Sequence, residues 1–145
     1  MLKNLIIIFF VYFIFTINLF AKDISPIGAL EGLNNNLIII DVRNKEEWSE
    51  TGVIPDAKLI QMLSTGRTIR KGYIEEIINT LGANKDIKAA IICHSGGRSS
   101  ATVSILEEKG YTNISNISEG MVGDGKTTGW ITRGLPVVKC TKECK

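Results

Sequence analysis

The residues most able to do chemistry lie in one short run that begins at Cys93 and reads CHSGGRS. The adjacent Gly96 and Gly97 allow the backbone to turn tightly with its N–H groups pointing inward, a geometry that binds anions. A helix beginning at Ser99 would add the partial positive charge of its N-terminus, and Arg98 would add a full charge. We therefore expect Cys93 to be present as the nucleophilic thiolate, in a cradle that could also hold a persulfide or a small oxyanion.

Cys93 also has a purely structural interpretation, as a small buried hydrophobe that ends a strand. The glycines and the arginine behind it favour the nucleophile, because a packing cysteine needs no positive nest. The other residues of the run, all candidates for anion binding, are His94, Ser95, Gly96, Gly97, Arg98 and Ser99. We interpret His94, the single histidine, as a contact at the rim rather than as a base, because neighbouring side chains in a turning loop usually diverge.

Two further cysteines, Cys140 and Cys144, lie in the short tail 140–145. They are too few for a structural zinc site, which takes four ligands, and the sequence predicts no metal and no cofactor. In an oxidising compartment we expect them to form a disulfide, which leaves Cys93 as the odd, free thiol. The alternative is a redox enzyme in which the tail pair resolves a Cys93 persulfide or disulfide.

The elements that must position Cys93 alternate between strand-like and helix-like patterns. Strands are predicted over 37–42, 57–60, 88–93, 113–117 and 135–138, and helices over 26–33, 45–51, 73–81 and 99–109. This alternation predicts an α/β fold, a parallel sheet with helices on both faces. In such sheets the working site lies at the carboxyl ends of the strands, where Cys93 and the segment from Asp41 to Arg43 are expected to meet.

The first twenty residues differ from the rest of the chain. Residues 5–20 form an uncharged apolar run that follows Lys3 and precedes a small residue, Ala21, a pattern typical of a secretory signal. We interpret residues 1–21 as a cleaved signal peptide, with an uncleaved membrane anchor as the second interpretation. A core helix ranks third, because the run has no polar face. The predicted location is exported, most simply the periplasm.

Composition excludes several function classes. A chain of 145 residues holds one domain of ordinary size, here residues 22–139, besides a targeting segment. The net charge of +2, with no basic run and only 7% aromatic residues, does not suggest a nucleic-acid-binding protein. The basic residues Arg67, Arg70 and Lys71 form a small cluster, interpreted as a solvated face in preference to an anion-attracting rim.

Several motifs, taken in order, resemble the rhodanese-like domain family. The loop from Cys93 to Ser99 is similar to the active-site loop of its sulfurtransferases, and the segment from Asp41 through Trp48 to Ala57 resembles the first family signature. Glu119 and the segment from Trp130 to Val137 resemble the closing segment, although the glycine-rich stretch 120–129 is longer than usual and is expected to be a flexible surface loop.

The resemblance implies sulfur transfer by double displacement through a Cys93 persulfide. A donor such as thiosulfate would give up its outer sulfur, and a thiol, cyanide or an acceptor protein would take it. The six residues from Cys93 to Arg98 match sulfurtransferases, because the related phosphatases have one residue more. Asp41 and Arg43 would brace the loops. A persulfide carrier or binding module is the second reading, and a thiol redox enzyme or a phosphatase is the third.

Overall fold

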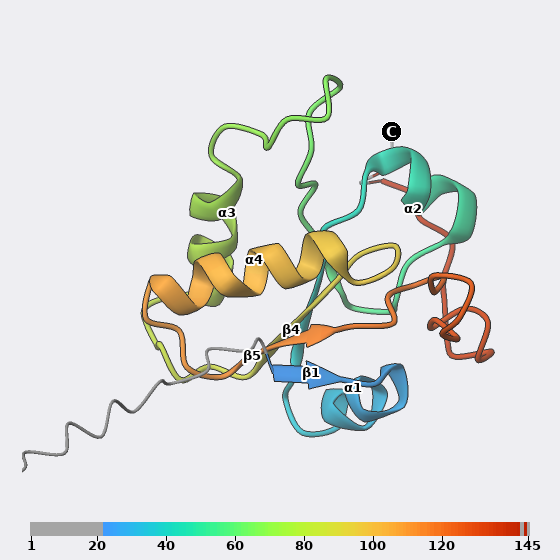
Figure 1. Ribbon diagram of the computed structural model, residues 1–145, viewed down its shortest axis with the longest axis horizontal. Helices are drawn as coiled ribbons and strands as arrows, with labels where there is room; N and C mark the ends of the chain where they lie inside the picture. Colours follow the sequence, from blue (N-terminus) through green and yellow to red (C-terminus); the bar gives the residue numbers. More distant parts are fainter. Residues whose placement is uncertain (1–21, 143, 145) are drawn as a thin grey trace, which may run out of the picture.

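Five parallel strands form the centre of the protein in a computed structural model, which describes residues 22–142 and residue 144 (Figure 1). In chain order the elements are β1 (Lys22–Ile24), α1 (Pro26–Leu33), β2 (Ile38–Asp41), α2 (Lys45–Thr51), β3 (Lys58–Leu59), α3 (Tyr73–Leu81), β4 (Ala89–Ile92), α4 (Gly97–Glu108) and β5 (Ile114–Ile117). The spatial order of the strands is β1-β5-β4-β2-β3, and all four strand pairs are parallel. The predicted α/β fold is confirmed.

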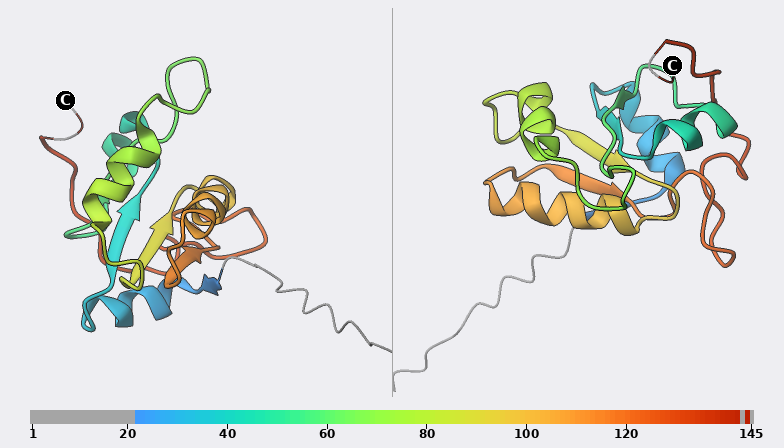
Figure 2. Two further views of the ribbon diagram at one scale, coloured as in Figure 1. Left: turned by 90° about the vertical axis from the view of Figure 1, so that its left-hand side faces the viewer. Right: turned by 90° about the horizontal axis from the view of Figure 1, so that it is seen from above.

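The central strands β2 and β4 are buried on both faces of the sheet, as their unbroken apolar runs predict. Alternate residues point to opposite sides, so that Ile40 and Ile91 pack with α3 and α4, whereas Ile39 and Ile92 pack with α1 and Trp130. In Figure 1, α1 lies below β1, β4 and β5, whereas α3 and α4 lie above them; Figure 2 shows the same elements from two further sides. Helices therefore cover both faces, as predicted.

Local signals place several helix ends correctly. The Ser25 hydroxyl accepts a hydrogen bond from the N–H of Gly28 at 3.1 Å, and α1 starts with a proline in its first turn. Helix α2 follows Asn44 as its N-cap and ends at Gly52, and α3 ends at Gly82. These ends depend on hydrogen bonds among close neighbours in the sequence.

Three expectations differ from the structure. Helix α4 begins at Gly97, two residues before the predicted start, because Gly96 adopts φ +94° and serves as its N-cap. Residues 135–138 form no strand; only Val138 makes a single antiparallel bridge, to Val53. Strand β1 was not predicted, since it has only three residues and forms by pairing with β5, far away in the sequence.

The parallel register brings together the ends of β2 and β4, which carry the candidate functional residues. In the pairing of β2 with β4, Asp41 lies opposite Ile92, so that Arg43 and Cys93 follow at the same edge of the sheet. The expected meeting of these two segments at the carboxyl ends of β2 and β4 is thereby confirmed. Within the part of the chain that the structure describes, no helix is long and apolar enough to cross a membrane. The predicted signal peptide, residues 1–21, lies outside the described residues.

Candidate active site

Cys93 lies directly after β4, buried to 1% exposure at the floor of the loop that connects this strand to α4. Its sulfur accepts a hydrogen bond from the backbone N–H of Gly96 at 3.2 Å. The Ser99 hydroxyl lies 3.3 Å from the sulfur and shares its single proton between the sulfur and the carbonyl oxygen of Gly96, at 3.0 Å. Both donors stabilise a negatively charged sulfur. Cys93 is also the free cysteine of the described residues.

The loop around Cys93 depends on glycine at Gly96. A Cβ at this position would lie 2.0 Å from the backbone oxygen of Ser118, in addition to the cost of φ +94°. The backbone after β5 also holds the loop, because the N–H groups of Met121 and Val122 donate to the carbonyl oxygens of Cys93 and His94 at 2.8 and 2.9 Å. The cradle is therefore fixed by its own turn and by the segment packed against it.

The first turn of α4 supplies the remaining donors of the cradle. The N–H groups of Gly97, Arg98 and Ser99 occupy the first three helical positions, where no acceptor exists within the helix itself. With the N–H of Gly96, they converge at the positive end of the helix dipole. The arrangement suits an anionic sulfur or an oxyanion above Cys93.

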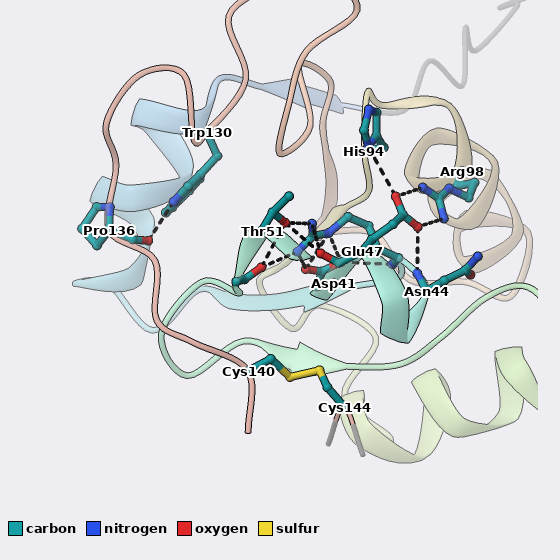
Figure 3. A network of polar contacts seen from close by, with 12 residues as sticks. Asp41, Asn44, Glu47, Thr51, His94, Arg98, Trp130, Pro136, Cys140 and Cys144 are labelled. Carbon is teal, nitrogen blue, oxygen red and sulfur yellow. Dashed lines mark hydrogen bonds and ion pairs between the residues drawn. A yellow bond between two sulfur atoms is a disulfide. The ribbon is translucent and has the colours of Figure 1, made fainter. Parts of the chain in front are cut away.

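Arg98 does not point its charge into this cradle. Its guanidinium forms two parallel hydrogen bonds to the carboxylate of Glu47, at 2.8 and 2.7 Å, from the start of α4 to α2 (Figure 3). The sequence predicts that Arg98 adds a full positive charge to the nest and fixes either the loop or the charge of the donor. In the structure this charge is paired with Glu47, which agrees with fixing of the loop. The two parallel N–H groups of a guanidinium match the two oxygens of a carboxylate, so that this ion pair connects the Cys93 loop to α2.

Glu47 is the residue that sequence reasoning missed. Besides the Arg98 pair, its carboxylate accepts the backbone N–H of Asn44 at 2.9 Å and lies 3.4 Å from Nδ1 of His94. Burial would raise the pKa of Glu47, but the hydrogen bonds from Arg98 and Asn44 outweigh burial and lower it. The available signal was the spacing of Asn44 and Glu47, typical of a capping box. His94 is half-exposed and faces Glu47, a position at the rim.

Asp41 and Arg43 form a second, fully buried ion pair below the loop. The carboxylate of Asp41 accepts hydrogen bonds from Nε and Nη2 of Arg43, at 2.8 to 3.0 Å. Arg43 also donates to the Thr51 hydroxyl at 2.7 Å and to the carbonyl of Gly52 at 2.8 Å. These bonds connect the end of β2 to the end of α2, the helix that carries Glu47.

Helix α3 contacts the first turns of α4 through hydrogen bonds that begin at Tyr73. The hydroxyl groups of Tyr73 and Thr102 are 2.7 Å apart, and Thr102 donates to the carbonyl of Arg98 at 2.9 Å. Burial of the phenol raises the pKa of Tyr73 well above its ordinary value. Tyr73 therefore stays neutral and acts as a fixed hydrogen-bonding group under the loop.

The tail cysteines and the glycine-rich stretch lie beside the site rather than in it. Cys140 and Cys144 are joined by a disulfide, drawn at the opposite side of the α2 region from His94 (Figure 3). The stretch 120–129 was expected to be flexible. Residues 124–128 are exposed, as expected of a surface loop, and the carboxylate of Asp124 accepts hydrogen bonds from the N–H groups of Lys126 and Thr127 at 2.9 and 2.8 Å.

The basic residues Arg67 and Arg70, neighbours in the sequence, have different surroundings in the structure. Arg70 donates to the carbonyl of Gln61 and forms an ion pair with Glu76. Arg67 instead lines a cavity of about 400 Å³ together with Arg98 and Glu47. Across residues 22–142 and residue 144, no group of three or more His, Cys, Asp and Glu side chains is placed to hold a metal ion.

Comparisons with known proteins agree with this geometry. The family model for the rhodanese-like domain matches residues 27–125. The putative sulfurtransferase YtwF of Bacillus subtilis is 36% identical over 109 residues, which cover 73% of this chain and 93% of the relative. The crystal structure of Rv0390 from M. tuberculosis has a TM-score of 0.70 at 25% identity, and covers 83% of this chain and 99% of that one. That of a rhodanese-like domain protein from Staphylococcus aureus has a TM-score of 0.56 at 32% identity, with coverage of 70% and 89%. The chain therefore belongs to the rhodanese-like domain family, a family of sulfur transfer.

Proposed function

We propose that the protein is a thiosulfate-type sulfurtransferase that carries sulfur as a persulfide on Cys93. In the first step, the Cys93 thiolate attacks the outer sulfur of thiosulfate. A new S–S bond forms to Cys93, and sulfite leaves with the electron pair of the broken bond. In the second step, cyanide or a thiolate attacks the outer sulfur of the persulfide, and Cys93 leaves as the thiolate.

One observation carries this proposal: the Cys93 sulfur accepts hydrogen bonds from the N–H of Gly96 and the hydroxyl of Ser99, at the first turn of α4. These groups are already in place before substrate arrives, so that they stabilise negative charge on sulfur without reorganisation. The N–H groups of Gly97 and Arg98, in the first turn of α4, have no acceptor within the helix and would be available to the outer sulfur of a persulfide or to the leaving sulfite. The proposed attack by a thiolate requires no general base.

The test combines a mass measurement with turnover. Incubation with thiosulfate should add one sulfur atom to the wild-type protein, at Cys93, and subsequent cyanide should remove it and release thiocyanate. Cys93→Ser should show neither reaction, whereas the double variant Cys140→Ser/Cys144→Ser, which lacks the tail disulfide, should show both. A wild-type Cys93 that remains unmodified after thiosulfate treatment would refute the proposal.

A persulfide carrier is the second candidate, favoured by the burial of Cys93 to 1% exposure. A carrier would load sulfur from thiosulfate but release it slowly to cyanide, and quickly only to a partner protein. Fast steady-state thiocyanate formation would exclude this reading. A redox enzyme that uses Cys140 and Cys144 is the third, and the double variant above would abolish its activity.

We further propose that the protein is exported, with residues 1–21 acting as a signal peptide and a retained membrane anchor as the alternative. The apolar run 5–20 and the disulfide between Cys140 and Cys144 support this location. The N-terminal residue of the protein recovered from the periplasm should be Lys22. Recovery of the intact chain in the membrane fraction would favour the anchor, and recovery in the cytosol would refute export.

A further inference from the structure

A protruding arm of residues 63–69 stands beside the candidate active site. Leu63 and Ile69 form an antiparallel bridge at its base, and the Ser64 N–H donates to the carbonyl of Thr68 at 2.8 Å. In Figure 1 the arm is the green excursion at the top, on the same side of the molecule as α2. The arm is thus a defined hairpin-like turn, and it carries Arg67 near its tip.

Arg67 has a backbone conformation that is uncommon for a residue with a side chain. Its φ is +60°, although the neighbouring Gly66 could adopt this conformation without steric cost. Such conformations in residues other than glycine concentrate at functional sites. Asn36 and Asp56 share this conformation, so the argument for Arg67 depends on the surroundings of its side chain.

Arg67 also differs from every other arginine of the chain. Arg43, Arg70, Arg98 and Arg133 each form an ion pair with a carboxylate. Within the described residues, the guanidinium of Arg67 has no such partner. Its charge is therefore available to a ligand, whereas the charge of Arg98 is committed to Glu47.

The cavity beside Arg67 is lined by side chains of both charges. Its lining residues are Asn44, Glu46, Glu47, Leu63, Arg67 and Arg98. Since Arg98 and Glu47 neutralise each other, the remaining charges are one cation, Arg67, and one anion, the exposed Glu46. A volume of about 400 Å³ is far larger than thiosulfate needs, and Glu46 would repel a small dianion. A ligand that carries both charges fits better.

We propose that this cavity binds the sulfur acceptor, and that Arg67 and Glu46 select a small thiol with a carboxylate and an ammonium group, that is, an amino-acid thiol. The inference rests on the proposed function. Arg67 would hold the carboxylate and Glu46 the ammonium group, and the thiol would point toward Arg98, the lining residue that lies at the end of the Cys93 loop and the start of α4. The acceptor thiolate attacks the outer sulfur of the protonated persulfide, a bond forms between the two sulfurs, and Cys93 leaves as the thiolate.

The test compares acceptors that carry one, both or neither of the two charges. With thiosulfate as donor, the KM is measured for cysteine, N-acetylcysteine, cysteamine and mercaptoethanol. Arg67→Gln should raise the KM for cysteine and N-acetylcysteine by about fivefold to tenfold, the worth of one charge-assisted hydrogen bond at a partly exposed site. It should leave cysteamine and mercaptoethanol unchanged. Glu46→Gln should act on cysteine and cysteamine instead.

Lys71→Gln provides the matched control, because Lys71 is an exposed cation just beyond the arm and does not line the cavity. If Lys71→Gln and Arg67→Gln changed the KM for cysteine equally, the effect would come from the overall charge of the protein, and the inference would be overturned. The inference would also be overturned if Arg67→Gln slowed only the formation of the persulfide from thiosulfate, because Arg67 would then bind the donor rather than the acceptor. If the wild type forms no Cys93 persulfide at all, the proposed function itself fails. If it forms the persulfide but Arg67→Gln leaves the KM for cysteine unchanged, only this inference fails.

Discussion

Replacement of Glu47 by glutamine should both destabilise the protein and slow sulfur transfer. The substitution preserves the shape of the side chain but removes its charge, which balances Arg98 through hydrogen bonds of 2.8 and 2.7 Å. The two side chains are only 22% and 23% exposed, so that solvent compensates the loss in part. The contribution of such a pair to stability lies between that of an exposed ion pair and that of a fully buried one. We therefore expect the free energy of unfolding to fall by about 2 kcal/mol.

This loss should appear as a drop in Tm of roughly 5 to 10 °C for a domain of this size. Transfer should slow as well, because Arg98 lies within the cradle of N–H groups, and a loop released from α2 positions these donors less accurately. The assays are urea or thermal unfolding and thiocyanate formation from thiosulfate and cyanide. Glu50→Gln is the matched control, since Glu50 lies on the exposed face of the same helix and should leave both values unchanged.

The dependence on pH gives the sharpest check. The pKa of Glu47 is lowered in the folded protein, so that its stabilising contribution is fully present above the ordinary value of 4.5 and is lost as the pH falls through the lowered pKa. The difference in stability between wild type and Glu47→Gln should therefore be constant near neutral pH and shrink below pH 4.5. A variant as stable as the wild type at pH 7, or a difference that grows on acidification, would refute the reasoning.

Three further substitutions test the surroundings of the site. Gly96→Ala should destabilise the fold by about 3 kcal/mol or more, because its Cβ would meet a backbone oxygen at 2.0 Å, whereas Gly97→Ala has open space and should leave the urea midpoint nearly unchanged. Asp41→Asn leaves a fully buried arginine without a charge partner and should cost about 3 to 5 kcal/mol by chemical denaturation; a cost below 1 kcal/mol would contradict the buried pair. Cys140→Ser/Cys144→Ser opens a very short loop and should cost at most about 2 kcal/mol by the same measurement.

Much of the fold could be predicted from local patterns. The apolar runs of β2 and β4 required strands buried on both faces, and Gly52 and Gly82 marked the ends of α2 and α3. Strand β1 could not be predicted in this way, because it forms only through its pairing with β5. The turn at Gly96 is intermediate: two adjacent glycines signal a tight loop, but the contact with Ser118 that excludes any side chain comes from a distant segment.

The sequence by itself determined the candidate nucleophile and its surroundings, since a cysteine, two glycines and a helix start in one short run suffice to build a cradle of N–H groups around Cys93. The tertiary structure alone decided where the charges go. A guanidinium bonds to the nearest well-oriented carboxylate, and only folding shows that Arg98 reaches Glu47, 51 residues away in the chain, whereas Arg67 reaches none. Local bonding can be inferred from neighbouring residues, but the pairing of charges depends on distances that the packed elements create.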